Sequence, residues 1–460
     1  MRDYRKVRFR VTKNETLGAQ DDEVDVCTLN PDSIVYYEAS FETSIKSGYN
    51  PCSSLYITIL HDSNTQAILD LPSDARKKIY FEVLEGGTYS WYGSFYAESI
   101  HLDKEAHEIT ITAYDYLYFL AQKNFKGTNV KSQSFDQWVN GENLEPYMPD
   151  FGALCPKWGA AFVDGSGSAS GYLPQTTCRD ALRLVAEASG TVFYYGSRML
   201  DGIRQDEVLL FRDVPSDEQD IYTISPDSIV EGTVIKTNEN NKTAISVLYR
   251  QYSAPDSTIA LQEIASGKNI LVGAGERVTV DFDLLLFPVD SDPANVKIYV
   301  NDIIPSSRIS YKLYGDHILV TIDNTAGTTS VTTFVTIMGK PLVVNEKAVE
   351  RGDKESQTTT VIDNPLIDTR SRAAYVSLIH TMYDLGSSRV RFEFFDPDAR
   401  EPELLDNVIL EGTSYQDLII VKKTVRASSS ELSIALEGVE YANAYASALS
   451  FAEGGDTNDP

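Results

Sequence analysis

The chain has 460 residues, of which 42% are hydrophobic and 23% are charged, and its formal net charge is −27. At about 150 residues per domain this length predicts roughly three domains, each with enough apolar residues to bury a core. A surface this acidic repels DNA and anionic lipid, which argues against a protein that coats or reads nucleic acid. It fits a conduit through which DNA passes without binding, or a large assembly that its charge keeps soluble.

The hydropathy pattern and the cysteines of the sequence indicate neither export nor membrane insertion. The N-terminal sequence MRDYRKVRFRV has no apolar core of the kind that a signal peptide needs. No stretch reaches the roughly 20 apolar residues that would span a bilayer. The four cysteines, Cys27, Cys52, Cys155 and Cys178, lack the spacing of a zinc site. We expect buried free thiols in a protein that folds in a reducing cytoplasm.

Residues 1–125 predict one β-rich domain, because short β-branched and aromatic runs alternate with turn residues. The opening strand alternates Val7, Phe9 and Val11 with polar residues. Further strands are expected at Val26–Leu29, Ile34–Ile45, Leu55–His61 and Ile79–Leu84. Gly86-Gly87 is typical of a hairpin turn.

The segment Tyr92–Gln122 organises this domain and predicts a strand, a charged turn, a strand and a short helix. In the second strand Ile109, Ile111 and Ala113 alternate with polar residues, which is the pattern of a half-buried strand. Asp115 stands where a helix N-cap belongs, and apolar residues follow it at the spacing of one helix turn. We therefore expect this segment to close a barrel or sandwich and to continue into a helix.

Residues 126–225 predict a small α+β domain. Its loop-rich start leads into Gly165–Gly171, a flexible tract that lacks the Lys-Ser/Thr ending of a phosphate loop. Thr177 begins a helix that ends at Gly190, with Asp180 in place of the usual Glu or Gln of a capping box. The apolar face of this helix comprises Leu182, Val185, Ala186 and Ser189, and the strands Val192–Tyr195 and Glu207–Arg212 follow.

The rest of the chain predicts a second β-barrel domain, made of residues 226–264 and 341–445 and interrupted by an inserted β-sandwich at 265–340. The sandwich strands are expected at Val278–Phe282, Val296–Val300, Ile309–Leu313, Ile318–Ile322 and Val331–Met338. A helix capped by Thr369 has Tyr375, Leu378, Ile379 and Met382 on its expected buried face. The closing strands are Arg389–Phe395, Val408–Leu410, Leu418–Thr424 and Leu432–Val439, and residues 446–460 predict a disordered tail.

No repeat of 20–50 residues is evident, although strand pairs lead into a capped helix more than once. The overall expectation is a mainly β protein with a minor α+β part: two β-barrels, a small α+β domain between them, and an inserted sandwich.

Catalytic and metal-binding patterns are not found in the sequence. His101 and His107 flank the charged turn, near Asp103 and Glu105, but no third ligand with metal-site spacing accompanies them, so a solvated turn is favoured. His61 and His317 are interpreted as polar loop residues. His380 is expected to pack through hydrogen bonds beside the apolar face of its helix rather than to catalyse. We predict no catalytic residue, no metal and no cofactor.

Several short patterns have a simple explanation. Arg351-Gly352-Asp353 is an RGD triplet in what we predict to be a polar loop, and chance accounts for it. The sequons at Asn14 and Asn241 mean little without secretion. The 27 tyrosines could stack against sugar rings, but filling β-rich cores and subunit interfaces is the favoured role.

Three landmarks, taken in order, resemble the tail hub (baseplate hub) proteins of tailed phages of Gram-positive hosts. The first is Gly93-Ser-Phe-Tyr-Ala97 followed by Ile109-Thr-Ile-Thr-Ala-Tyr-Asp115. The second is Thr177–Gly190 with Val192-Phe-Tyr and Leu209-Leu-Phe-Arg212 after it. The third is Asn364-Pro-Leu-Ile367 with the following helix and the strands from Arg389 to Val439. The block at 265–340 departs from the family pattern as an insertion, and no lysin or fibre domain is appended.

The resemblance implies a non-enzymatic structural protein of the virion tail, assembled in the bacterial cytoplasm. It implies a homotrimer whose paired barrels form a pseudo-sixfold ring between the tail tube and the tail tip. The implied partners are the tail tube and distal tail proteins, the tape measure protein and a tail-tip or spike protein, with DNA passing through the channel without specific binding. Two alternatives stay open: a virion-associated cell-wall hydrolase, and a carbohydrate-binding tail-tip protein that uses the 265–340 sandwich.

Overall fold

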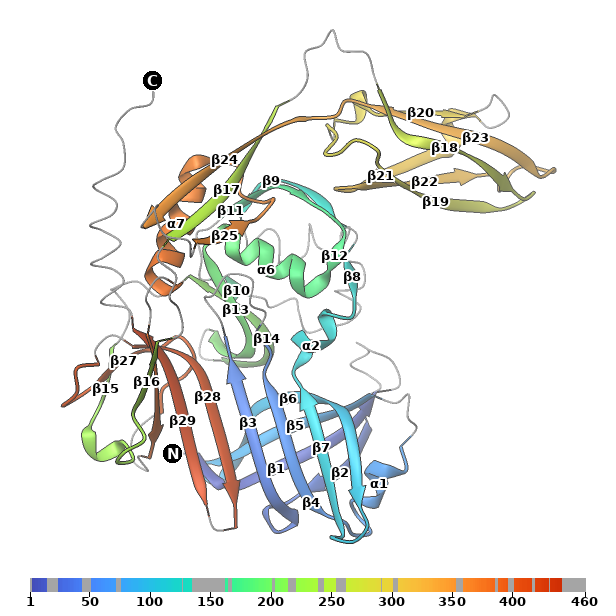
Figure 1. Cartoon of the computed structure of the whole chain (residues 1–460). Coiled ribbons are helices and arrows are strands. Elements are labelled where there is room, and N and C mark those ends of the chain that lie inside the picture. The colour runs from blue at the N-terminus through green and yellow to red at the C-terminus, as the bar shows by residue number, and fades with distance from the viewer. Residues whose placement is uncertain are drawn as a thin grey trace.

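The computed structural model describes residues 2–14, 24–43, 51–71, 76–125, 127–134, 162–163, 168–200, 203–213, 221–238, 244–253, 262–290, 292–300, 305–352, 359–384, 388–395, 401–415, 418–429 and 431–440. Strands dominate these residues, which confirms the mainly β class. A large sheet, a middle layer that contains the two longest of the described helices, and a separate sandwich follow one another through the molecule (Figure 1). Cys155, the sequon residue Asn241 and the predicted tail at 446–460 lie outside the described residues.

The large sheet has 13 strands and joins the two ends of the chain. Its main path runs β16-β26-β29-β28-β3-β4-β7-β6-β5-β1-β2, and β27 pairs with both β28 and β15. The strands from the N-terminal part are β1 (Arg2–Asn14), β2 (Val24–Leu29), β3 (Ile34–Glu42), β4 (Ser54–Leu60), β5 (Arg76–Glu85), β6 (Thr88–Asp103) and β7 (Glu108–Tyr114). The others are β15 (Ile221–Ile224), β16 (Ile235–Asn238), β26 (Ser388–Phe394), β27 (Asn407–Leu410), β28 (Leu418–Ser428) and β29 (Leu432–Glu440).

The organising segment has the predicted form. The β5–β6 hairpin turns at Gly86 and Gly87, whose φ angles of 59° and 90° suit glycine. In β7, Ile109, Ile111 and Ala113 are fully buried in the core of the N-terminal strands. The Asp115 carboxylate accepts the backbone N–H of Leu117 at 3.0 Å and caps α2 (Tyr116–Leu120). A short helix, α1 (Gln66–Leu69), lies between β4 and β5.

The middle layer surrounds helices α6 (Cys178–Ser189) and α7 (Arg370–Asp384), which share one core. The Thr177 hydroxyl accepts the N–H of Asp180, and Gly190 ends α6 at φ 73°, so both predicted caps are confirmed. The strands of this layer are β8 (Asn124–Phe125), β9 (Thr128–Ser134), β10 (Phe162–Val163), β11 (Ser168–Leu173), β12 (Thr176–Thr177), β13 (Thr191–Leu200), β14 (Ile203–Asp213), β17 (Ala244–Ser253), β24 (Val343–Gly352) and β25 (Thr359–Asp363). The strands β17, β24 and β25 come from the range predicted as the second barrel, but they form a sheet separate from the large one. Helix α7, from the same range, packs through Ile379 against Ile419, Val421 and Val439 of the large sheet. The domain limits themselves stay a prediction.

The predicted buried face of α7 is confirmed in part, because Ile379 is buried and Leu378 is partly buried. Tyr375 is 47% exposed, whereas Val376, Ser377 and Thr381 are buried. The hydroxyls of Ser377 and Thr381 donate to the carbonyls of Ala374 and Ser377 within the helix, at 2.8 and 2.6 Å. Because these polar side chains satisfy themselves on the helix backbone, they can face the core, which apolar spacing alone does not reveal.

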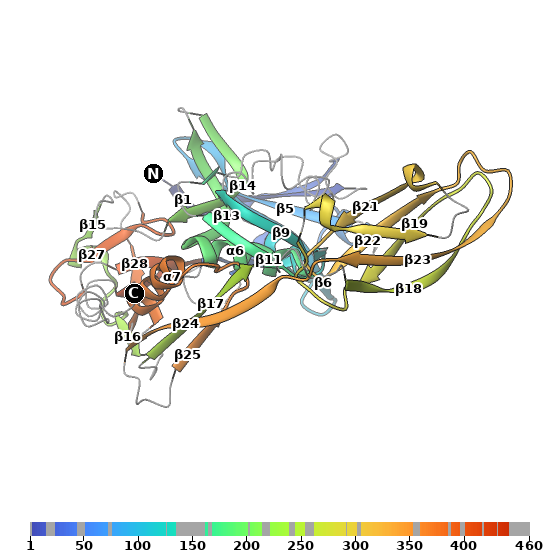
Figure 2. The ribbon, with the colours of Figure 1, turned by 90° about the horizontal axis from the view of Figure 1, so that it is seen from above.

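The inserted block is a β-sandwich that stands to one side of the other layers (Figures 1 and 2). One sheet contains β18 (Gln262–Val272), β23 (Val331–Gly339) and β20 (Lys297–Val300), and the other contains β19 (Arg277–Asp283), β22 (His317–Asp323) and β21 (Ile309–Leu313). The two sheets enclose a core of their own. His317 is buried rather than a polar loop residue, because its ring stacks on Tyr314 at 4.5 Å and its Nδ1 lies 2.8 Å from Asp316 Oδ1.

The large sheet contains the same strand arrangement twice. The chain order β2, β3, β4, β5, β6, β7 corresponds to β15, β16, β26, β27, β28, β29, and in both sets the third strand pairs with the second and the sixth, and the fifth with the fourth and the sixth. The N-terminal set has one extra strand, β1, between β2 and β5, whereas β15 pairs directly with β27.

Residue-level features support this repeat. Pro31–Val35 and Pro226–Val230 have the identical sequence Pro-Asp-Ser-Ile-Val, and each begins with a one-turn 3-10 helix. Ile34 then pairs with Ile59 of β4, and Ile229 forms a bridge with Phe394 of β26. The identical pentapeptide was the sequence signal of this duplication, and a search for periods of 20–50 residues is too short to detect it.

Candidate functional site

The two strand sets meet where β3 pairs with β28, and we call this pairing the seam. It is antiparallel from Lys422 opposite Glu42 to Ser428 opposite Tyr36. Near its middle, Ser40 Oγ lies 3.3 Å from Thr424 Oγ1, although the two residues are 384 positions apart. At its end the ammonium of Lys422 lies 3.3 Å from the Glu42 carboxylate. A long-range pairing therefore makes one sheet from two similar halves.

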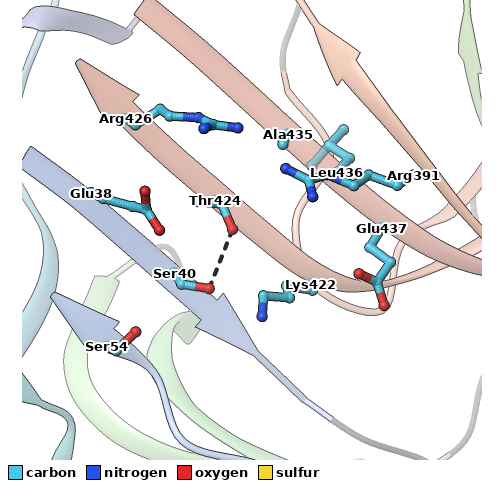
Figure 3. Close-up of a pocket in the computed structure, with 10 residues that line it drawn as sticks. All are labelled: Glu38, Ser40, Ser54, Arg391, Lys422, Thr424, Arg426, Ala435, Leu436 and Glu437. Atoms are coloured by element: carbon cyan, nitrogen blue, oxygen red, sulfur yellow. Dashed lines mark hydrogen bonds between the residues drawn. The ribbon is translucent and has the colours of Figure 1, made fainter. Parts of the chain in front are cut away.

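The polar face of the seam forms a shallow pocket of about 250 Å³ (Figure 3). Its lining residues are Glu38, Ser40, Ser54, Arg391, Lys422, Thr424, Arg426, Ala435, Leu436 and Glu437. Acidic partners stand beside several of its basic groups: Arg426 lies 3.6 Å from Glu393, and Arg389 of the same face lies 2.5 Å from Glu437. Charges of both signs therefore lie on this face: Arg391, Lys422 and Arg426 line the pocket together with Glu38 and Glu437.

The opposite face of the seam is held by a buried polar network. Lys423 is 1% exposed, and its ammonium lies 3.2 Å from Glu401 and 3.5 Å from Glu403. The hydroxyl of Tyr4, in β1, donates to the Glu401 carboxylate and lies 2.9 Å from the Tyr92 hydroxyl. The Lys423 ammonium also lies over the Tyr92 ring, 5.3 Å from its centre. Strands β1, β6 and β28 and the segment before β27 are thereby tied together.

Apart from His317, the histidines singled out in the sequence lie in or beside the turn after β6, after the end of β4, and on α7. His101 and His107 are exposed, and the Asp103 carboxylate accepts the N–H groups of Glu105 and Ala106 within the turn. His61 lies 2.8 Å from Gln66 through its Nε2, and His380 is buried on α7. Within the described part of the chain, no group of three or more His, Cys, Asp or Glu side chains could hold a metal ion.

The remaining candidates from the sequence are Arg351 of the RGD triplet and the cysteines. Arg351 lies on strand β24 rather than in a loop, and its Nε donates to Ser377 Oγ at 2.7 Å; Asp353 lies outside the described residues. Cys27, Cys52 and Cys178 are free thiols, as predicted. The Cys52 thiol donates to Asp115 at 3.4 Å, and burial together with this carboxylate raises the pKa of Cys52. None of the helices in the described ranges is long and apolar enough to span a membrane.

Comparisons with known proteins find similarity in structure but not in sequence. No protein-family model and no curated protein matches the chain. The tail protein from Neisseria meningitidis MC58 has 10% sequence identity and a TM-score of 0.47, over 95% of this chain and 99% of that chain. The 43 kDa tail protein of prophage MuSo2 from Shewanella oneidensis has 10% identity and a TM-score of 0.46, over the same shares of 95% and 99%. The prophage tail protein gp18 from Listeria monocytogenes EGD-e has 10% identity and a TM-score of 0.41, over 98% and 100%. All three of these chains are tail proteins.

Proposed function

We propose that this protein is a structural tail hub that forms a trimeric, pseudo-sixfold ring between a tail tube and a tail tip. The observation that carries the proposal is the duplicated strand set joined through the seam. One chain supplies two similar units side by side, so three chains supply six, which matches a sixfold tube on one face and a threefold tip on the other.

The polar face of the large sheet is the proposed lining of the ring. Its strands alternate, with one face in the apolar cores and the other carrying polar residues such as Ser40, Thr424 and Lys422. The mixed charges of this face and the net charge of −27 disfavour binding to DNA phosphates, so DNA can pass without adhering. The partners are the tube, distal tail, tape measure and tip proteins that the family resemblance implies.

Light scattering and negative-stain imaging of the purified chain test the ring. We expect a particle of three times the 51.1 kDa chain mass, with a threefold outline and a central pore. A chain that stays monomeric at micromolar concentration and never enters tail particles would overturn the proposal.

A second candidate, glycan binding, is favoured by one observation on the sandwich. Tyr299 on β20 and Phe334 on β23 are 52% and 44% exposed on the same outer sheet face, beside Leu271 at 69%. Exposed aromatic rings can stack on sugar rings. A glycan array probed with the full chain and with the Tyr299→Ala variant tests this role; binding that Tyr299→Ala leaves unchanged would contradict this placement of the site.

A further inference from the structure

Comparison of the two strand sets shows that one edge of β6 lacks a neighbouring strand among the described residues. In both hairpins a β-bulge interrupts the fifth strand, between Ala97 and Ser99 in β6 and between Ile420 and Lys422 in β28. Aligning the bulges places Ile100, His101 and Leu102 at the positions of Lys423, Thr424 and Val425. In β28 the side away from β29 is covered by β27 at its start and by β3 from Lys422 onward. In β6 the corresponding side is covered by β5 as far as Tyr96, and among the described residues no strand pairs with it beyond that point.

The side chains of β28 are also more deeply buried than those at the corresponding positions of β6. Lys423 and Val425 are 1% and 0% exposed under β3, whereas Ile100 and Leu102, which face the same core, are only partly buried. Residues 98, 99, 101 and 103 are exposed. An unpaired strand edge that carries partly buried apolar side chains can pair with a further strand.

The complementary edge lies at the other end of the large sheet. β16 occupies the position of β3 in the second strand set: Ile235 and Thr237 pair with Arg391 and Arg389 as Glu38 and Ser40 pair with Tyr56 and Ser54. β3 uses its second edge to form the seam, but β16 pairs only with β26 among the described strands. Ile235 is 56% exposed and Thr237 is exposed as well.

We infer that residues 100–103 of β6 pair antiparallel with β16 of a second copy of this chain, in the register of the intrachain seam. This pairing repeats, between molecules, the contact that the chain already makes within itself, and it rests on the proposed ring only for the number of copies. The expected opposite residues are Asp103 and Ile235, Leu102 and Lys236, His101 and Thr237, and Ile100 and Asn238. A heterologous contact of this kind, between two different edges, closes into a ring when the rotation allows it.

Cysteine pairs test the register directly, because a disulfide needs Cβ atoms about 4 Å apart. In the seam, Ser40 and Thr424 face each other at 3.3 Å between their hydroxyl oxygens, so the Ser40→Cys/Thr424→Cys variant provides an intrachain positive control. The test variant is His101→Cys/Thr237→Cys, at the corresponding positions. The control for register is His101→Cys/Ile235→Cys, which is displaced by two residues on the same strand. The chain with only its native cysteines is oxidised in parallel.

The inference predicts covalent dimers and trimers for the 101/237 pair on a non-reducing gel, and about five-fold less for the 101/235 pair, given the steep distance dependence of disulfide formation. Light scattering of the unoxidised variants separates the two proposals. A trimer that yields no intermolecular 101/237 disulfide, while the 40/424 control oxidises, overturns the edge pairing and leaves the ring. A monomer without the crosslink overturns both proposals.

Discussion

The ammonium of Lys423 lies 3.2 Å from the Glu401 carboxylate in a part of the protein where both side chains are almost fully excluded from solvent. Lys423 belongs to the seam strand β28, and Glu401 also accepts a hydrogen bond from Tyr4, 397 positions earlier in the chain. One buried ion pair is thus connected to both ends of the sequence. Burying two charges is costly, and removing one of them leaves the other without compensation.

Lys423→Met should therefore destabilise the large sheet by about 3–5 kcal/mol, the usual cost of leaving a buried charge unpaired. The measurement is the free energy of unfolding in urea, followed through tyrosine and tryptophan fluorescence. Adding Glu401→Gln to Lys423→Met should recover part of the loss, because the second change removes the unpaired charge. A Lys423→Met variant as stable as the wild type would show that the ion pair contributes nothing to the seam.

Asp115 predicts a pH dependence of stability. Burial raises the pKa of Asp115 to about 6, against the hydrogen bonds from Ser53, Cys52 and Leu117, which lower it. The unfolded value is about 3.9, so between about pH 4 and pH 6 the folded state binds more protons than the unfolded state, and stability falls as pH rises through this window. The change is about 2–3 kcal/mol at two pKa units.

Asp115→Asn is the matched variant, because Asn also caps helices and does not titrate. We expect the wild type to lose about 2 kcal/mol relative to Asp115→Asn between pH 4 and pH 7, as measured by urea unfolding at each pH. A difference between the two proteins that is constant with pH would contradict the raised pKa. A difference of opposite sign would mean that the hydrogen bonds outweigh burial.

We expect Gly190, at the end of α6, to be required for close packing against α7. Its φ of 73° favours glycine, and a Cβ at this position would overlap the ring of Tyr375 and lie 2.8 Å from Ile379 Cδ1. Gly190→Ala should cost about 2–3 kcal/mol, roughly 1 kcal/mol of it from backbone strain and the rest from the contact. Hydrogen exchange of the α6 amides and thermal unfolding measure this loss.

The Tyr375→Ala change separates the two causes. Because Tyr375 is half exposed, its removal alone should have a small effect, and in the double variant it should relieve part of the overlap, with a coupling of about 1 kcal/mol. Purely additive effects would assign the cost of Gly190→Ala to backbone strain and to the contact with Ile379 rather than to Tyr375.

Local features were determined by the sequence itself. The hairpin within Tyr92–Gln122, the caps at Asp115, Thr177 and Gly190, and the strands of the 265–340 sandwich all depend on neighbouring residues: period-two alternation, side-chain oxygens beside free N–H groups, and glycine at positive φ.

Partnerships between distant strands were decided by the tertiary structure alone. Nothing in the spacing of β3 or β28 shows that Ser40 lies opposite Thr424, because an alternating strand specifies which face is buried but not which strand lies beside it. For the same reason the sequence does not show that β17 and β24 pair within the middle layer. Helical spacing likewise does not show that α7 buries Ser377 and Thr381 rather than Tyr375. Period-two and helical patterns report burial locally, whereas the seam, the repeat and the open edge of β6 exist only once the two ends of the chain have met.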